Sequence, residues 1–230
     1  MALNDYSKIE QKLNLENSNS LFETLSPLPF PLCYPQCLIY KDEIIICGGY
    51  KKNECYSYHI IKDQYKYICS YPDNIILNGH CVIKIEKNNY DLNDITLLSF
   101  GGEKDKEKYT FIMKYKSIWE DNNNNKIKHI NEWIPFINNN NNDNNNNNNI
   151  NIGLKPDNYA GVRAIISGSN NHLLFIVYPS RNFCIFDLNK YQIIKNGYLP
   201  INAYLFLSKK FTTFKDILFS LKNDGCFILV

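Results

Sequence analysis

The sequence predicts an all-β protein assembled from repeated four-stranded units, and three observations lead to this prediction. The 230-residue chain is 44% apolar and 14% aromatic, with 17 Tyr and 13 Phe, residue types that favour strands over helices. Its apolar runs are short and are separated by Asn, Asp, Lys and Gly, which is typical of many short antiparallel strands. A Gly-Gly pair closes an apolar run at 48–49 and again at 101–102, which indicates an internal repeat.

The first two units contain several apolar runs each, with the Gly-Gly pair at the end of the second run. The first unit covers about residues 33–70, with runs in 36–49, 55–59 and 65–69. The second covers about residues 77–137, with runs in 79–85, 95–102, 109–115 and 132–136. Several of these runs are apolar throughout, as expected for strands that are covered on both faces.

A third unit is predicted over residues 158–196, and a partial fourth over 202–230. The third unit keeps the strand pattern but has Tyr178-Pro179 where the Gly-Gly pair should stand. The fourth would comprise apolar runs at 203–208 and 225–230, where the given sequence stops.

Two segments fall outside this pattern because they lack the apolar groups that offset the entropy cost of ordering a chain. Residues 1–24 are polar and are predicted to be a mobile leader. Residues 138–151 are almost pure Asn and are predicted to be a disordered insertion. This tract is interpreted either as a repeat expansion tolerated in a surface loop or as a self-associating element.

The pattern resembles the Kelch-repeat family of β-propellers, which is related to galactose oxidase. The resemblance covers about residues 30–200 and rests on an apolar strand ending in Gly-Gly, a following strand with Tyr, and a last strand with Trp or another aromatic. The matching residues are Gly48, Gly49, Tyr58 and Tyr67 in the first unit and Gly101, Gly102, Tyr115 and Trp133 in the second. It implies a partial Kelch-type propeller of about three and a half four-stranded antiparallel blades, fewer than a closed propeller has.

The physical role of these residues follows from the predicted architecture. Glycine tolerates a sharp turn at positive φ where backbones approach closely, and the aromatic residues would pack between blades. A blade cannot cover both of its faces alone, so neighbouring blades must stack.

No enzyme motif is found, and no catalytic, metal or cofactor site is predicted. A phosphate-binding loop and a His-Glu-x-x-His zinc motif are both absent from the sequence. His80 and Cys81 are adjacent and would point to opposite faces of a strand, so His80 is expected to be structural and satisfied by neighbouring backbone. The cysteines are expected to be free, mostly buried thiols. A copper enzyme of galactose-oxidase type is a less favoured alternative, since the four His show no ligand arrangement.

The predicted function is a non-enzymatic protein-binding scaffold with a partner of unknown identity. In the family, partners dock on loops after the Gly-Gly pairs and before each first strand, here 50–54, 103–108, 179–182, 77–79 and 157–163. The candidate contact residues are Tyr50, Lys51, Lys52, Glu103, Lys104, Tyr159, Arg163 and Arg181. The alternative is a propeller that senses a small molecule or carbohydrate.

Further expectations concern partners and location. A net charge of +2 does not favour nucleic acid or an anionic membrane. Self-association is expected if the protein is no longer than this chain. No secretory signal or long apolar run is seen, so a cytoplasmic or nuclear location is expected.

Overall fold

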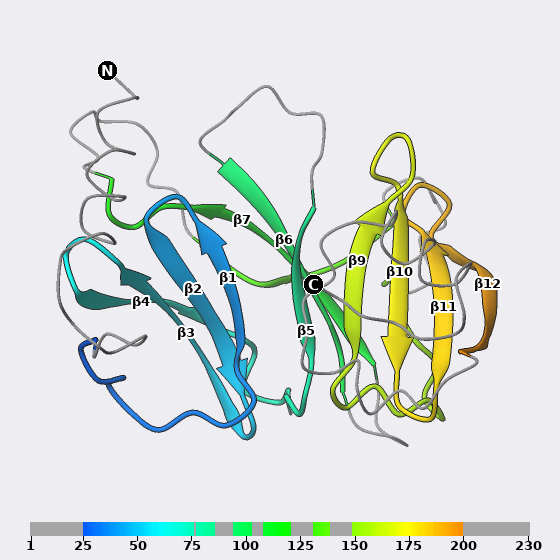
Figure 1. Ribbon diagram of the computed structural model, residues 1–230, viewed down its shortest axis with the longest axis horizontal. Helices are drawn as coiled ribbons and strands as arrows, with labels where there is room; N and C mark the ends of the chain where they lie inside the picture. Colours follow the sequence, from blue (N-terminus) through cyan, green and yellow to red (C-terminus); the bar gives the residue numbers. More distant parts are fainter. Residues whose placement is uncertain are drawn as a thin grey trace, which may run out of the picture.

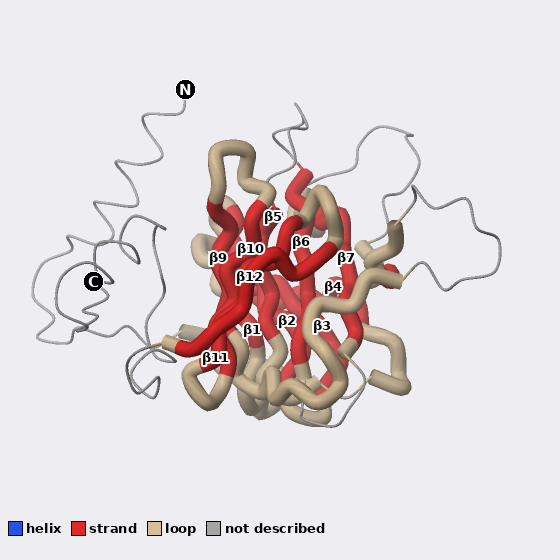
Figure 2. Tube along the Cα trace, turned by 90° about the vertical axis from the view of Figure 1, so that its right-hand side faces the viewer, coloured by secondary structure: helices blue, strands red, loops and turns tan. Residues whose placement is uncertain are grey.

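The described part of the protein is built from three four-stranded antiparallel sheets. The computed structural model describes residues 25–75, 77–85, 94–102, 108–120, 131–138 and 149–199. Within these ranges there is no helix, and strands and loops account for the whole trace (Figure 2). The structure therefore confirms the predicted all-β class.

The strands follow one another along the chain, and each sheet is a simple meander in which sequential strands pair. The first sheet contains β1 (Gln36–Tyr40), β2 (Glu43–Gly49), β3 (Lys52–His59) and β4 (Gln64–Ser70). The second contains β5 (Cys81–Ile85), β6 (Asp94–Gly101), β7 (Tyr109–Lys116) and β8 (Ile134–Pro135). The third contains β9 (Arg163–Ser167), β10 (Leu173–Tyr178), β11 (Asn182–Asp187) and β12 (Gln192–Tyr198).

The first strands of the three sheets lie together, and the later strands fan outward from them. β5 contacts β1 on one side and β9 on the other. Figure 1 shows β1, β5 and β9 in the middle, with β4 and β12 toward the two flanks. Each sheet thus places its first strand inward and its last strand outward.

The core consists of two apolar layers, one on each face of the second sheet. β6 shows how one strand serves both layers: Ile95 and Leu97 pack toward the first sheet, whereas Leu98 and Phe100 pack toward the third. All four side chains are buried, at 5% exposure or less. This explains why apolar residues dominate the run, with only Thr96 and Ser99 polar between positions 95 and 100, since a strand that is covered on both faces has no solvent-facing positions.

Residues 25–35 run beside the face of the first sheet that points away from the second. The Phe30 ring lies 4.9 Å from the Tyr56 ring, measured between centroids. The Tyr50 amide donates a hydrogen bond of 2.7 Å to the Cys33 carbonyl. The Tyr65 hydroxyl donates one of 3.1 Å to the Ser26 carbonyl. This proline-rich segment therefore shields part of a sheet face that would otherwise be in water.

Two aromatic residues of the predicted repeat lie elsewhere than expected, and the first is Tyr58, which is buried on the outer face of the first sheet, where its hydroxyl donates to Asp63. Tyr67 was expected to pack between sheets, but it lies on the opposite face and is 55% exposed. Tyr71, just after β4, occupies the interface instead and stacks on Trp133 at 4.7 Å between ring centroids. Tyr67 pairs with Tyr56, whose ring contacts Phe30, so both rings face away from the second sheet.

The Asn-rich insertion ends earlier than predicted. Asn149 forms an isolated bridge with Ile137, and the Ile150 amide donates a 2.7 Å hydrogen bond to the Phe136 carbonyl. Ile150 and Ile152 are buried in the second apolar layer. Residues 149–151 thus belong to the folded part. Residues 139–148, the predicted leader 1–24 and the predicted fourth unit 202–230 lie outside the described residues.

No helix in the described ranges is long and apolar enough to cross a membrane.

Candidate binding face

Glycines bring the starts of β5 and β9 together at one end of the sheets. The Gly161 amide donates a 2.7 Å hydrogen bond to the Gly79 carbonyl. Gly79 has φ of +60°, and a Cβ at this position would lie 2.3 Å from the Gly161 nitrogen. Only glycine allows two backbones to approach this closely in that conformation.

The same end carries the turns that follow β2 and β6. Gly48 has φ of +54°, and a Cβ there would lie 2.4 Å from Leu77 Cδ1. Gly101 has φ of +119°, and its Cβ would lie 2.9 Å from Val162 Cγ1. Gly49 is buried beside the Cys33 carbonyl, and Gly102 forms a bridge with Tyr159. The glycine pairs therefore allow the ends of β2 and β6 to pack closely against neighbouring loops.

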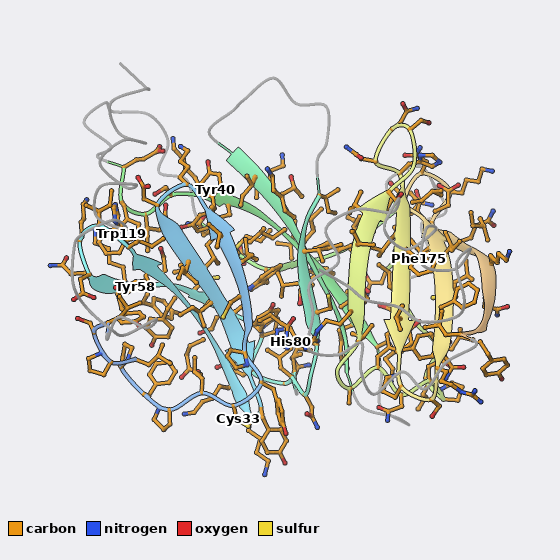
Figure 3. All side chains as sticks on the ribbon, viewed as in Figure 1. Cys33, Tyr40, Tyr58, His80, Trp119 and Phe175 are labelled. Atoms are coloured by element: carbon orange, nitrogen blue, oxygen red, sulfur yellow. The ribbon has the colours of Figure 1, made fainter. Side chains whose placement is uncertain are left out.

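We call the surface formed by residues 33–34, 50–52, 157–163 and 179–182 the loop face. These segments adjoin the first and third sheets and gather at the lower end of the molecule in Figure 1, where Cys33 is marked in Figure 3. Tyr34 is 66% exposed and Tyr50 40% exposed, and Lys51, Lys52 and Arg181 are also exposed. The loop face thus displays aromatic and basic side chains side by side, a composition suited to recognition.

Two predicted contact segments are less available than expected. Tyr159 is fully buried, with its hydroxyl 3.5 Å from Cys184 Sγ and its ring 4.5 Å from the Tyr178 ring. It is a core residue, and its prediction as a contact residue was wrong. In the loop 77–79, Leu77 and Gly79 are buried, so this loop supports the face from beneath.

The two arginine side chains differ in their solvent exposure. Arg181 lies in the turn after β10 and is exposed, with φ of +64°. Arg163 opens β9 and is half-buried, and its guanidinium donates to the Val162 carbonyl at 2.9 Å. Glu103 and Lys104 lie outside the described residues, so the structure does not place them.

The residues that sequence reasoning missed on this face come from the segment before the first strand. Tyr34 and the exposed thiol of Cys33 lie beside Tyr50, because the Cys33 carbonyl holds the Tyr50 amide. Their signal in the sequence was the run of prolines at 27, 29, 31 and 35, which marks an extended segment and carries no repeat pattern.

His80 lies where the sheets meet, as labelled in Figure 3, and it is 1% exposed. Its ring approaches Tyr71 at 5.8 Å between centroids, and it lines a small pocket with Ser99 and Tyr109 among others. That pocket has room for about one water molecule. Neither ring nitrogen forms a hydrogen bond with a described residue, although the main chain of Cys47 lies near. The Cys47 main chain is thus the backbone group that lies close enough to act as the expected partner of His80, at a geometry short of a regular hydrogen bond.

Burial of His80 predicts a specific dependence of stability on pH. Burial lowers the pKa of His80 to about 4, with a further lowering from the positive charge of Arg163 and a partial offset from the Cys47 main chain. The unfolded chain binds the proton near pH 6.5 and the folded protein only near pH 4, so stability falls as the pH drops through this window. The loss at pH 4 is about 3 kcal/mol.

The measurement compares urea unfolding of the wild type and of His80→Phe at pH 7 and pH 4. Other carboxylates and histidines titrate in both proteins, so the difference between the two losses isolates His80. We expect the wild type to lose more stability on acidification than the variant. Equal losses in the two proteins would show that His80 is protonated in the folded state without penalty.

The described residues hold no group of three or more His, Cys, Asp or Glu side chains arranged to hold a metal ion. The chain matches no model of a known protein family, and a search of curated proteins finds no similar sequence.

Proposed function

We propose that this protein is a Kelch-type propeller segment that acts as a non-enzymatic protein-binding scaffold through the loop face. The observation that carries the proposal is the convergence of loops beside the first and third sheets on one exposed, aromatic and basic surface. The meander topology, with β1, β5 and β9 innermost, supports the propeller architecture. Rigid sheets that present loops at one end are a common way to position recognition residues.

The character of the loop face favours a protein partner over a small molecule. Tyr34 and Tyr50 offer flat, half-exposed rings, the Lys51 ammonium lies 5.1 Å from the centroid of the Tyr50 ring, and Arg181 adds an exposed positive charge in the β10–β11 turn. The pocket beside His80 is far smaller than a sugar ring, and apolar residues such as Leu77, Phe100 and Phe111 account for most of its lining. A wide surface with exposed aromatic and arginine side chains is typical of contacts between proteins.

The test is affinity capture with the full chain, carried out with wild type and with a Tyr50→Ala/Arg181→Glu variant. Partners captured by the wild type should be depleted at least about 10-fold in the variant, because aromatic and arginine side chains dominate interface energetics. A matched control is Lys62→Glu, an exposed charge reversal in the β3–β4 turn at the opposite end of the first sheet.

The three proteins should unfold at similar urea concentrations, since the altered side chains are exposed. Partners that bind the wild type and the double variant equally, or that are lost with Lys62→Glu alone, would show that the loop face is not the binding surface.

A further inference from the structure

Three cysteines form a row across the first sheet. Cys47 on β2 is directly opposite Cys55 on β3, and Cys55 is directly opposite Cys69 on β4. Residues that pair directly across antiparallel strands project to the same face. All three thiols therefore face the apolar layer between the first and second sheets.

The row exists because of the bulge between β3 and β4. Tyr56 pairs with Tyr67, and an unshifted register would then pair Cys55 with Ile68. The shift between Cys55 and Tyr56 instead places Cys69 opposite Cys55. The bulge thus brings two sulfurs together that a regular ladder would place on opposite faces.

The sulfur of Cys55 is surrounded by hydrogen-bond donors. The Trp133 indole N–H, from the second sheet, donates to Cys55 Sγ at 3.3 Å. Burial alone would raise the pKa of the Cys55 thiol, but hydrogen bonds from Cys47, Cys69, Trp133 and the Gly48 main chain outweigh it and hold the pKa well below its ordinary value. Such surroundings favour the thiolate, which is the reactive form of cysteine.

Of the three cysteines in this row, Cys69 is the most accessible to solvent. Cys47 and Cys55 are fully buried, whereas Cys69 is half-buried and lies 3.7 Å from Met113 Sδ, measured between sulfurs. A small oxidant can therefore reach Cys69 before it reaches the other two.

We propose that Cys69 and Cys55 form a reversible disulfide when the protein meets a hydroperoxide. Directly paired residues of antiparallel strands have Cα atoms about 4.5–5.5 Å apart, which lies within the range of disulfides. The pair is a modification site for peroxide, and it is independent of the loop face.

The chemistry balances with hydrogen peroxide as the oxidant. The Cys69 sulfur attacks one peroxide oxygen while the Cys55 thiolate takes the Cys69 proton, and the O–O bond breaks to give Cys69 sulfenic acid and hydroxide, which takes a proton from solvent to become water. The Cys55 sulfur then attacks the Cys69 sulfur, the S–O bond breaks, and a second water leaves. Two thiols are oxidised and one peroxide is reduced.

Formation of the disulfide also changes the contact between the first two sheets. The Trp133 N–H loses a thiolate acceptor and faces a neutral disulfide sulfur instead. Charged acceptors make stronger hydrogen bonds than neutral ones, so the contact across this interface weakens on oxidation.

The experiment uses the full chain with Cys33→Ser and Cys37→Ser, which removes the two thiols that are exposed among the described residues. The reduced protein is treated with hydrogen peroxide, its remaining thiols are blocked, and it is digested without reduction by trypsin and a protease that cleaves before Asp73. Mass spectrometry should find the peptide with Cys55 linked to that with Cys69, a loss of two thiols per molecule, and full recovery with dithiothreitol.

Variants separate this pair from the alternatives. Cys69→Ser should abolish the link, while Cys47→Ser and the buried control Cys184→Ser should retain it. A disulfide between Cys47 and Cys55 would overturn the proposal. So would stable sulfinic acid at Cys69 together with a Cys55 that carries the thiol-blocking reagent, since Cys55 would then have remained a free thiol. Since Cys69 is only half-buried, its Ser variant should fold, and the wild-type peptide map tests the proposal even if another variant does not.

Discussion

Replacing Trp133 by alanine should destabilise the protein by about 3–5 kcal/mol, the range for truncating a large buried aromatic. Trp133 is 3% exposed and stacks on Tyr71 with an interplanar angle of 12°. Its indole N–H also donates to Cys55. Trp133 belongs to the second sheet, whereas Tyr71 and Cys55 belong to the first. The substitution therefore removes a stacking contact and a hydrogen bond between the two sheets.

The chain contains two tryptophans, and the second provides the matched control. Trp119 is half-buried at the opposite end of the same interface, where its N–H donates to Ser57 at 2.8 Å and Lys66 lies over its ring. Trp119→Ala should cost clearly less than Trp133→Ala because part of its ring is already in water. Urea unfolding followed by circular dichroism measures both, and a cost of Trp133→Ala no greater than that of Trp119→Ala would contradict this role.

Gly79→Ala should be at least as damaging, with an expected loss above about 4 kcal/mol, the range in which single substitutions are exceptional. The new Cβ would meet three backbone atoms of Ala160 and Gly161, the nearest at 2.3 Å. These backbone atoms cannot move away from the new Cβ as the end of a long, flexible side chain can. The hydrogen bond from Gly161 to Gly79 must therefore break, and β5 and β9 must separate at the loop face.

Three further substitutions distinguish a steric clash from conformational strain. Gly161 has φ of +83° but nothing within 4 Å of a Cβ, so Gly161→Ala should cost only the strain, about 1–2 kcal/mol. Asparagine tolerates positive φ better than alanine, so Gly161→Asn should be milder still, whereas Gly79→Asn should remain as harmful as Gly79→Ala. If Asn rescued position 79, strain and not the close approach of backbones would be the cause. Chemical unfolding of the four variants measures this.

Several features of the fold were predictable because they depend on local pattern. The mostly apolar run at 95–100 indicated a strand covered on both faces, and β6 is buried in both layers. The glycines at 48–49 and 101–102 lie at the ends of β2 and β6, and three of them, Gly48, Gly101 and Gly102, have positive φ. Trp133 and Tyr115 are buried between the first two sheets, as large aromatic side chains were expected to be.

The candidate binding face was predicted only in part. The exposed positions Tyr50, Lys51, Lys52 and Arg181 follow the turns, and turns lie at the surface in any such arrangement. Tyr159 was misassigned because a tyrosine in a polar loop can point inward as readily as outward, and nothing nearby in the sequence specifies which. Its burial depends on Tyr178 and Cys184, which come from another part of the third sheet.

The sequence by itself determined the class of fold, the strand order within each sheet and the positions of the tight turns, since these follow from the spacing of apolar residues and glycines along one stretch of chain. Only the tertiary structure decided which side of a strand faces which neighbour. A single-residue bulge shifts the register of β4 after Tyr67, which brings Cys69 beside Cys55 where a regular ladder would place Ile68. Because successive side chains of a strand point to opposite faces, one extra residue moves every following side chain to the other face. Neither the amino-acid composition nor the spacing of apolar residues predicts where that extra residue lies.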